Sequence, residues 1–149
     1  MIITKSRKRL LTGLALMFLQ SCDRQAEIPE KQLHYEASKL NLVDRYNLYL
    51  HVYKSRFPRN PVLANDVAKL GHPARKYVLE RAAKSGATEF GAILDVLFAF
   101  GTKCSESEYR YLLSEADRIS TTSGEFAAFH RSIDGLCKGV LPPGVRGPR

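Results

Sequence analysis

Apolar residues recur at helical spacing along most of this 149-residue chain, and no segment shows the alternation of a half-buried strand. The longest series runs from Leu33 to Phe57 in steps of three or four residues. Such steps keep side chains on one face of a helix. The series predicts one long amphipathic helix that ends before Pro58, because proline disfavours the helical conformation in the residue that precedes it.

Proline and glycine divide the following chain into two more predicted helices. One opens at Pro61 and closes at Gly71, and the next opens at Pro73 and closes at Gly86. Proline is favoured in the first helical turn and glycine just beyond the last turn, so these positions indicate both ends of each helix.

Three further segments complete an all-α prediction. Residues 87–101, ATEFGAILDVLFAFG, are apolar on every side, which predicts a buried helix at the centre of the fold. A buried strand is the alternative, and the length of the segment favours the helix. Ser105 with Glu108, and Thr122 with Glu125, have the spacing of capping boxes, and an apolar series follows each pair. We therefore expect about six helices joined by short connections, as a small bundle or a short helical array.

One segment carries a resemblance to a known architecture. Residues 66–86, DVAKLGHPARKYVLERAAKSG, resemble a helical pair of the HEAT type through the LG-x-P-A turn between an apolar helix and the next. HEAT-like arrays offer surfaces to protein partners, and the resemblance implies a role of that kind. The chain has no clear sequence repeat, so a plain helical bundle stays open as the alternative.

The N-terminus has the three-part layout of a secretory signal peptide. KSRKR is cationic, residues 10–19 (LLTGLALMFL) are apolar, and the small residue Ser21 follows. As a helix, the apolar stretch rises only ~15 Å, whereas the hydrocarbon core of a bilayer is ~30 Å thick. A stable transmembrane helix is therefore not expected here.

The residues LQSC, 19–22, resemble the lipobox of bacterial lipoproteins, in which a leucine at −3 and a small residue at −1 precede an invariant cysteine. The resemblance implies cleavage before Cys22 and acylation of its thiol, so that lipid chains hold the protein on a membrane. Asp23 comes next, and an Asp at that place resembles the signal that retains lipoproteins at the inner membrane of enteric bacteria. An ordinary cleaved signal peptide and an uncleaved anchor are the alternatives.

This interpretation divides the chain into four parts. The parts are a lipoprotein signal peptide at 1–21, a lipidated tether at 22–30, a helical domain at 31–138 and a disordered, Pro- and Gly-rich tail at 139–149. The predicted location is the bacterial cell envelope, with the domain facing the periplasm.

The net charge of +8 gives little support to a nucleic-acid partner. Residues 1–21 carry four basic residues and no acidic one, so their removal leaves 19 basic and 15 acidic residues, a net charge of +4. The rest of the chain has no Lys- and Arg-rich stripe with interleaved aromatic residues. We therefore expect no nucleic-acid partner, and a cytosolic basic binding module is disfavoured.

Two cysteines, Cys104 and Cys137, remain once Cys22 is assigned to lipid. In an oxidising compartment such an even pair predicts a disulfide bridge. Two unpaired buried thiols are the alternative. A redox-active pair is disfavoured because the chain has no CxxC motif.

The sequence contains no recognisable catalytic or metal-binding constellation. Its four histidines, His34, His51, His72 and His130, form neither HExxH nor another metal-ligand spacing, so no metal or cofactor is expected. Asp95 is the only charged residue in the apolar run 91–100. We expect it to have a structural hydrogen-bond partner, and a functional acid with a raised pKa is the alternative.

The stretch 46–59, rich in tyrosine and arginine, is the first candidate for a partner-binding surface. Tyr49 and Arg56 are seven residues apart, which places them on one helical face, off the apolar series. Tyrosine and arginine are favoured at binding hot spots. The alternative is that a long helix simply exposes its amphipathic side chains.

Taken together, these features favour a lipid-anchored envelope protein that is not an enzyme and acts through protein contacts, as an accessory subunit of an envelope complex. An immunity or inhibitor protein against a secreted toxin would have the same anchor and build. An enzyme acting on the cell wall or on lipids, with an unrecognised site, is the third hypothesis.

Overall fold

The computed structural model describes residues 29–55, 61–101 and 103–139, and within these ranges it contains seven helices and no strand. The all-α fold class is therefore confirmed. The helices are α2 (Glu30–Ser38), α3 (Leu42–Ser55), α4 (Ala64–Ala68), α5 (His72–Ala82), α6 (Ala87–Ala99), α7 (Glu106–Ile119) and α8 (Ser123–Lys138). The predicted signal peptide, Cys22, Arg56 and residues 140–149 of the predicted tail lie outside the described residues.

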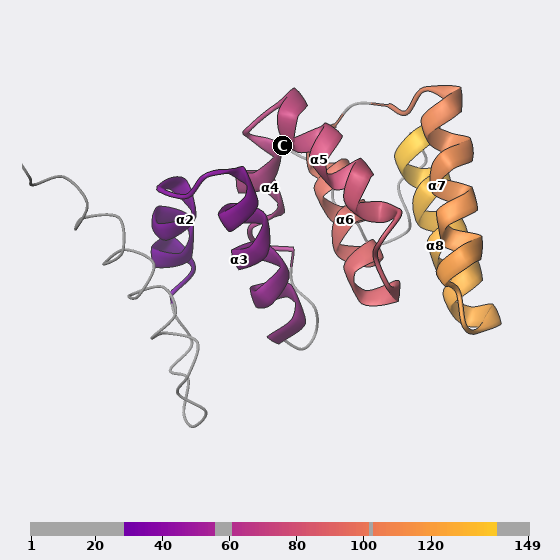
Figure 1. Ribbon diagram of the computed structural model, residues 1–149, viewed down its shortest axis with the longest axis horizontal. Coiled ribbons are helices and arrows are strands. Elements are labelled where there is room, and N and C mark those ends of the chain that lie inside the picture. The colour runs from indigo at the N-terminus through magenta and orange to yellow at the C-terminus, as the bar shows by residue number, and fades with distance from the viewer. Residues whose placement is uncertain (1–28, 56–60, 102, 140–149) are drawn as a thin grey trace, which may run out of the picture.

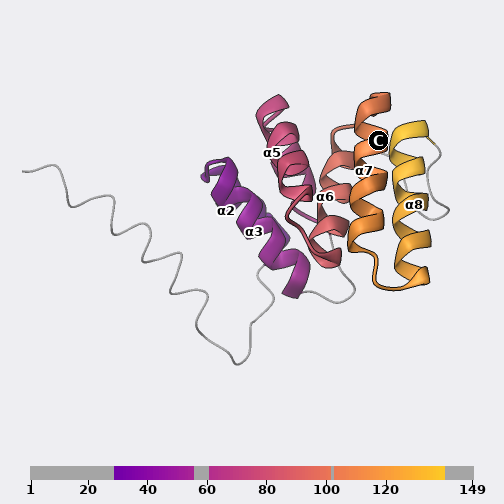
Figure 2. The ribbon, with the colours of Figure 1, turned by 45° about the vertical axis from the view of Figure 1, so that its right-hand side comes forward.

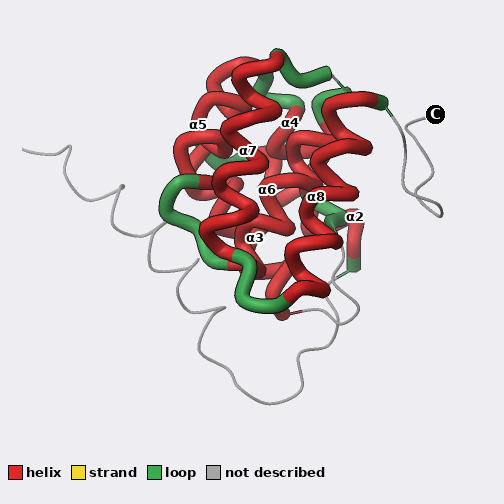
Figure 3. Tube along the Cα trace, turned by 90° about the vertical axis from the view of Figure 1, so that its right-hand side faces the viewer, coloured by secondary structure: helices red, strands yellow, loops and turns green. Residues whose placement is uncertain are grey.

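The helices lie side by side in a row, with α2 and α3 at one end and α7 and α8 at the other (Figures 1 and 2). Figure 3 looks along the row from its α7–α8 end and shows loops that join successive helices. Helices α4, α6 and α8 pack on one another in that order, while α5 packs along α6 and α7 along α8. Helix α4 contacts α6 more extensively than it contacts α5, and α5 also packs mainly on α6. The two helices of residues 66–86 are therefore not each other's main packing partners.

The predicted long helix from Leu33 to Phe57 is wrong, because the chain breaks between α2 and α3. Asn41 caps α3, and its side-chain oxygen accepts a hydrogen bond from the backbone N–H of Asp44 at 3.0 Å. Such a cap satisfies one of the orphan N–H groups at a helix start and stabilises a helix end at that position. Glu30, which was expected in the tether, is the first residue of α2.

A buried arginine, Arg45, holds the break between α2 and α3 together. Its guanidinium donates to the backbone oxygens of Ser38 and Leu40 at 3.1 and 2.9 Å. A third hydrogen bond, of 3.1 Å, reaches the backbone oxygen of Asp66 in α4. Arg45 thus satisfies carbonyl groups that the helix ends leave free, and it joins three helices.

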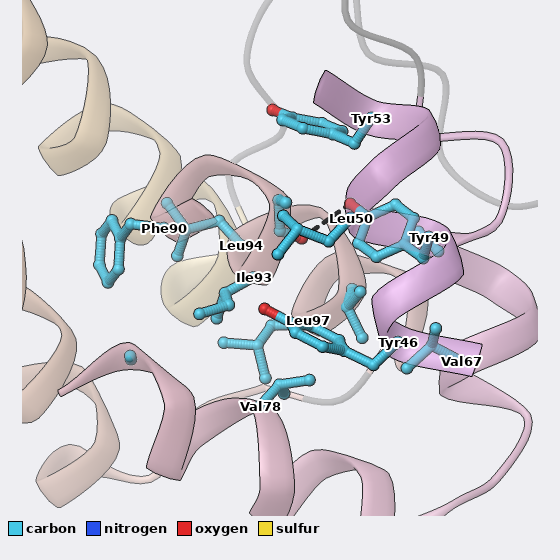
Figure 4. Packing of buried hydrophobic residues seen from close by; sticks show 14 of the residues in the cluster. Tyr46, Tyr49, Leu50, Tyr53, Val67, Val78, Phe90, Ile93, Leu94 and Leu97 are labelled. Atoms are coloured by element: carbon cyan, nitrogen blue, oxygen red, sulfur yellow. Dashed lines mark hydrogen bonds between the residues drawn. The ribbon is translucent and has the colours of Figure 1, made fainter. Parts of the chain in front are cut away.

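Helix α6 is the centre of the core, as its apolar sequence predicts. It packs against α3, α4, α5 and α8. Its buried residues are Phe90, Ala92, Ile93, Leu94, Val96 and Leu97, several of which are seen facing α3 in Figure 4. On the α8 side, Phe90 meets Phe129 edge to face, with ring centroids 5.1 Å apart.

Of the two capping boxes predicted in the C-terminal half, the one formed by Ser105 and Glu108 at α7 is confirmed. At the start of α8 the side chain of Thr122 accepts from the backbone N–H of Glu125, as expected, while the Glu125 carboxylate accepts from the backbone N–H of Thr121. Cys104 and Cys137 form the predicted disulfide, with their Cα atoms 4.6 Å apart. The bridge ties the residue before the α7 cap to the last turn of α8.

Candidate functional site

A groove of about 450 Å³ lies between α5 and α7. Its walls are His72, Arg75, Lys76, Leu79 and Glu80 from α5, and Glu108 and Tyr111 from α7. A smaller groove lies between α4 and the end of α6, and it is lined by Asn65, Ala68, Lys69, Ala99 and Phe100. Most of the residues that line the larger groove are polar or charged by type.

A two-point ion pair crosses the larger groove. Arg75 donates from Nε and Nη2 to the two carboxylate oxygens of Glu108, at 3.2 and 3.1 Å. The hydrogen bonds from Arg75 hold the pKa of Glu108 below its usual value. The guanidinium also lies 5.8 Å from the centroid of the Phe100 ring. Arg75 is therefore fixed in place by its surroundings while part of it faces solvent.

Tyr111 forms the apolar wall of the same groove. Its hydroxyl donates to the backbone oxygen of Leu79 at 2.9 Å, so the ring is held across the space between α5 and α7. Lys76 and Glu80 face each other along the rim at 3.9 Å. The groove residues provide no nucleophile paired with a base, and their chemistry suits recognition of a polar or charged partner.

Tyr49, expected on a partner-binding face, is fully buried between α3 and α6. Its hydroxyl donates to the backbone oxygen of Ala92 at 2.8 Å (Figure 4). The hydroxyl of Tyr46 donates to the side-chain carboxylate of Glu89 at 3.1 Å. Because α3 packs against both α4 and α6, its buried face is wider than the apolar series indicates. Tyr49 therefore belongs to the core and offers no surface to a partner.

Asp95 has the structural partner that its apolar surroundings require. The hydroxyl of Tyr53 hydrogen-bonds its carboxylate, and a Cβ added at Gly91 would lie only 3.1 Å from that hydroxyl, so the glycine allows the close approach. Burial nevertheless raises the pKa of Asp95 to about 6. Asp95 lines neither of the two grooves.

Replacing Asp95 by Asn is expected to stabilise the protein at neutral pH. The folded-state pKa is about 6 against 3.8 without burial, so the contribution of Asp95 to native stability is greatest below pH 3.8 and declines as the pH rises through 6. The Asn variant lacks this decline and retains an oxygen that accepts from Tyr53, so its advantage should grow between those pH values to at most about 3 kcal/mol. Urea unfolding at several pH values measures the difference.

The exposed Glu80→Gln variant is the matched control for Asp95→Asn. It should follow the wild-type pH profile, since Glu80 lies at the groove rim and not beside the core. An advantage of Asp95→Asn that is the same at pH 4 and pH 7 would contradict a buried, titrating carboxylate.

The histidines lie apart from one another and each has its own surroundings. His34 contacts the carboxylate of Asp66, and this hydrogen bond raises the pKa of His34. His130 bonds Asp117 at 2.8 Å and stacks on Phe126. His51 is exposed on α3, so it does not share a helix with His34 as expected, and His72 begins α5. Over the described ranges, no three His, Cys, Asp or Glu side chains gather as metal ligands would.

The Arg75–Glu108 groove has no local signal in the sequence. The two residues are 33 positions apart, so only the tertiary arrangement of the helices brings them together. The capping-box motif identified Glu108 as the partner of Ser105, but it gave no sign of the second partner. Tyr111 reaches Leu79 over a similar separation.

Comparison with models of known protein families, with curated proteins and with solved structures finds no significant match to this chain. The HEAT-type resemblance of residues 66–86 therefore stays a prediction. Among the helices that are described, none is both long and apolar enough to cross a bilayer.

Proposed function

We propose that this chain is a lipid-anchored protein of the bacterial envelope, an accessory subunit that acts through protein contacts and not by catalysis. The observation that carries the proposal is the disulfide between Cys104 and Cys137. Stable disulfides are typical of exported proteins and rare in the cytosol of mesophiles. With these two cysteines paired, Cys22 is the only cysteine left, and it stands in the lipobox-like sequence LQSC.

The groove between α5 and α7 replaces the α3 surface as the proposed site of partner contact. Arginine and tyrosine are enriched at binding hot spots, and the groove offers one of each. Arg75 and Tyr111 are both already held by hydrogen bonds within the domain. Binding therefore costs little further ordering of these side chains, which favours affinity.

The anchor is tested by the intact mass of the protein extracted from membranes of a bacterial host. We expect the mass of residues 22–149 plus acyl chains, and a gain of two hydrogens after reduction of the disulfide. A Cys22→Ser variant should carry no acyl chains and should leave the membrane fraction. A full-length chain without lipid in the cytosol would refute the envelope location.

The contact surface is tested by a photo-crosslinking amino acid placed in the native host. Lys76 at the groove and Lys54 on the exposed side of α3 are matched positions, since both are solvent-exposed lysines within helices. A discrete adduct is expected from position 76 and not from position 54. It should weaken when Tyr111→Ala is added, because that change removes the groove wall. Equal labelling from both positions would argue against the groove.

A further inference from the structure

The outward side of α2 carries basic, aromatic and uncharged polar residues, whereas the acidic residues of the helix lie at its flanks. Leu33 and Ala37 are buried against the domain, and Tyr35, two residues from each, lies on the opposite side of the helix with 61% of its surface exposed. The residues around Tyr35 on this outward side are Lys31, Gln32, Ser38 and Lys39, and none is acidic. Lys31, Tyr35 and Lys39 recur every four residues and form one stripe.

The acidic residues of α2 stand at its flanks. Glu30 faces His34 at 3.5 Å, and Glu36 meets Lys39 at 3.3 Å. The ammonium of Lys39 also lies 3.7 Å from the centroid of the Tyr35 ring. The stripe therefore presents a phenol ring between two ammonium groups, a combination suited to the interface between lipid headgroups and water.

Helix α2 is fixed to the rest of the domain, so the direction of its stripe sets the orientation of the whole row. Leu33 and Ala37 are part of the core cluster. His34 bonds Asp66 of α4, and Arg45 of α3 donates to the backbone oxygens at the end of α2.

The proposed anchor brings this stripe close to a membrane. Cys22 precedes Glu30, the first residue of α2, by eight positions. Even a fully extended chain of that length spans only ~27 Å. Such a short tether holds α2 at a high effective concentration over the lipid surface.

We propose that α2 lies on the membrane with its Lys31–Tyr35–Lys39 stripe against anionic lipid headgroups, and that this contact orients the domain. The inference rests on the proposed lipid anchor at Cys22. The short tether and a stripe that contains no carboxylate of its own, with Glu36 at its flank, favour a bilayer over a protein as the occupant. The α7–α8 end, at the far end of the row, is then left accessible to other proteins (Figure 1).

The test uses the absence of tryptophan from the chain. A Tyr35→Trp variant of the lipidated mature protein, residues 22–149, carries a single Trp, and it is reconstituted in phosphatidylglycerol vesicles with brominated acyl chains. Phe126→Trp is the matched control, because Phe126 is an exposed aromatic residue of α8, 44% exposed, far from α2. We expect a blue shift and quenching of Trp at position 35 and neither at position 126.

Adding Lys31→Gln and Lys39→Gln should reduce the membrane-contacting population by about fivefold for each lysine removed. The same loss is expected on changing to phosphatidylcholine vesicles. If the protein floats with the vesicles but Trp at position 35 stays unquenched, the proposed membrane contact of α2 is overturned while the lipid anchor stands. The stripe on α2 would then have another occupant. Protein that lacks acyl chains and does not float would refute the anchor itself.

Discussion

Replacing Tyr49 by Ala is expected to lower the free energy of unfolding by about 3 to 5 kcal/mol. The Tyr49 ring is fully buried and packs near Tyr46 and Tyr53, at centroid distances of 6.3 and 5.8 Å. Truncation leaves a void between α3 and α6, and the close packing of the core lets little of it collapse. Urea unfolding of the non-reduced protein, followed by circular dichroism, measures the change.

Two further variants separate packing from hydrogen bonding at this position. Tyr49→Phe keeps the ring and loses the bond to the backbone oxygen of Ala92, so it should cost only about 1 to 2 kcal/mol. Val43→Ala removes an apolar side chain that is 47% exposed on the same helix, and it should change stability by no more than about 0.5 kcal/mol. If Tyr49→Ala were as mild as Val43→Ala, Tyr49 would have to be a surface residue.

Tyr49 illustrates why the apolar series could not define the buried face of α3. The series has Tyr46, Leu50 and Tyr53 on one stripe, and all three are buried. A stripe of that width suits a helix with one neighbour, whereas α3 packs on both α4 and α6. The number of neighbours is a tertiary property, so local spacing carries no signal for it.

The break between α2 and α3 has a different cause. Hydrophobic periodicity continues across residues 39–41, because the two helices bury their apolar faces in the same core. Polar groups end the first helix and begin the second. The side chain of Asn41, a common capping residue three positions before Asp44, was the available local signal. The carbonyl bonds of Arg45 could not be foreseen from sequence.

Other elements were predictable because their signals are local or exclude alternatives. A segment that is apolar on every side must be buried, and this pattern predicts the central position of α6. The capping box of Ser105 and Glu108 needs only four consecutive residues. By contrast, the groove needs Arg75 and Glu108 to meet across α5 and α7. That contact depends on how the helices stack, which no short motif encodes.

Removing the disulfide through Cys104→Ser and Cys137→Ser is expected to lower the free energy of unfolding by about 4 kcal/mol. The two residues are 33 positions apart, so the bridge restricts a long loop of the unfolded chain, which contains most of α7 and α8. In the chain-entropy model this restriction is the main source of stabilisation. Chemical unfolding of wild type and double variant, without reductant, measures it.

Reduction of the wild-type protein is the internal control for the double variant. Adding a reductant should shift the wild-type unfolding midpoint close to that of the variant and leave the variant unchanged. Other contacts join the same two helices, including the hydrogen bond of 2.8 Å from Tyr109 to Asp134, so the reduced domain keeps part of its α7–α8 packing. An unchanged wild-type midpoint on reduction would contradict the expected contribution of the bridge. A marked loss would mean that the domain reaches full stability only where disulfides form, which is the condition that the proposed envelope location supplies.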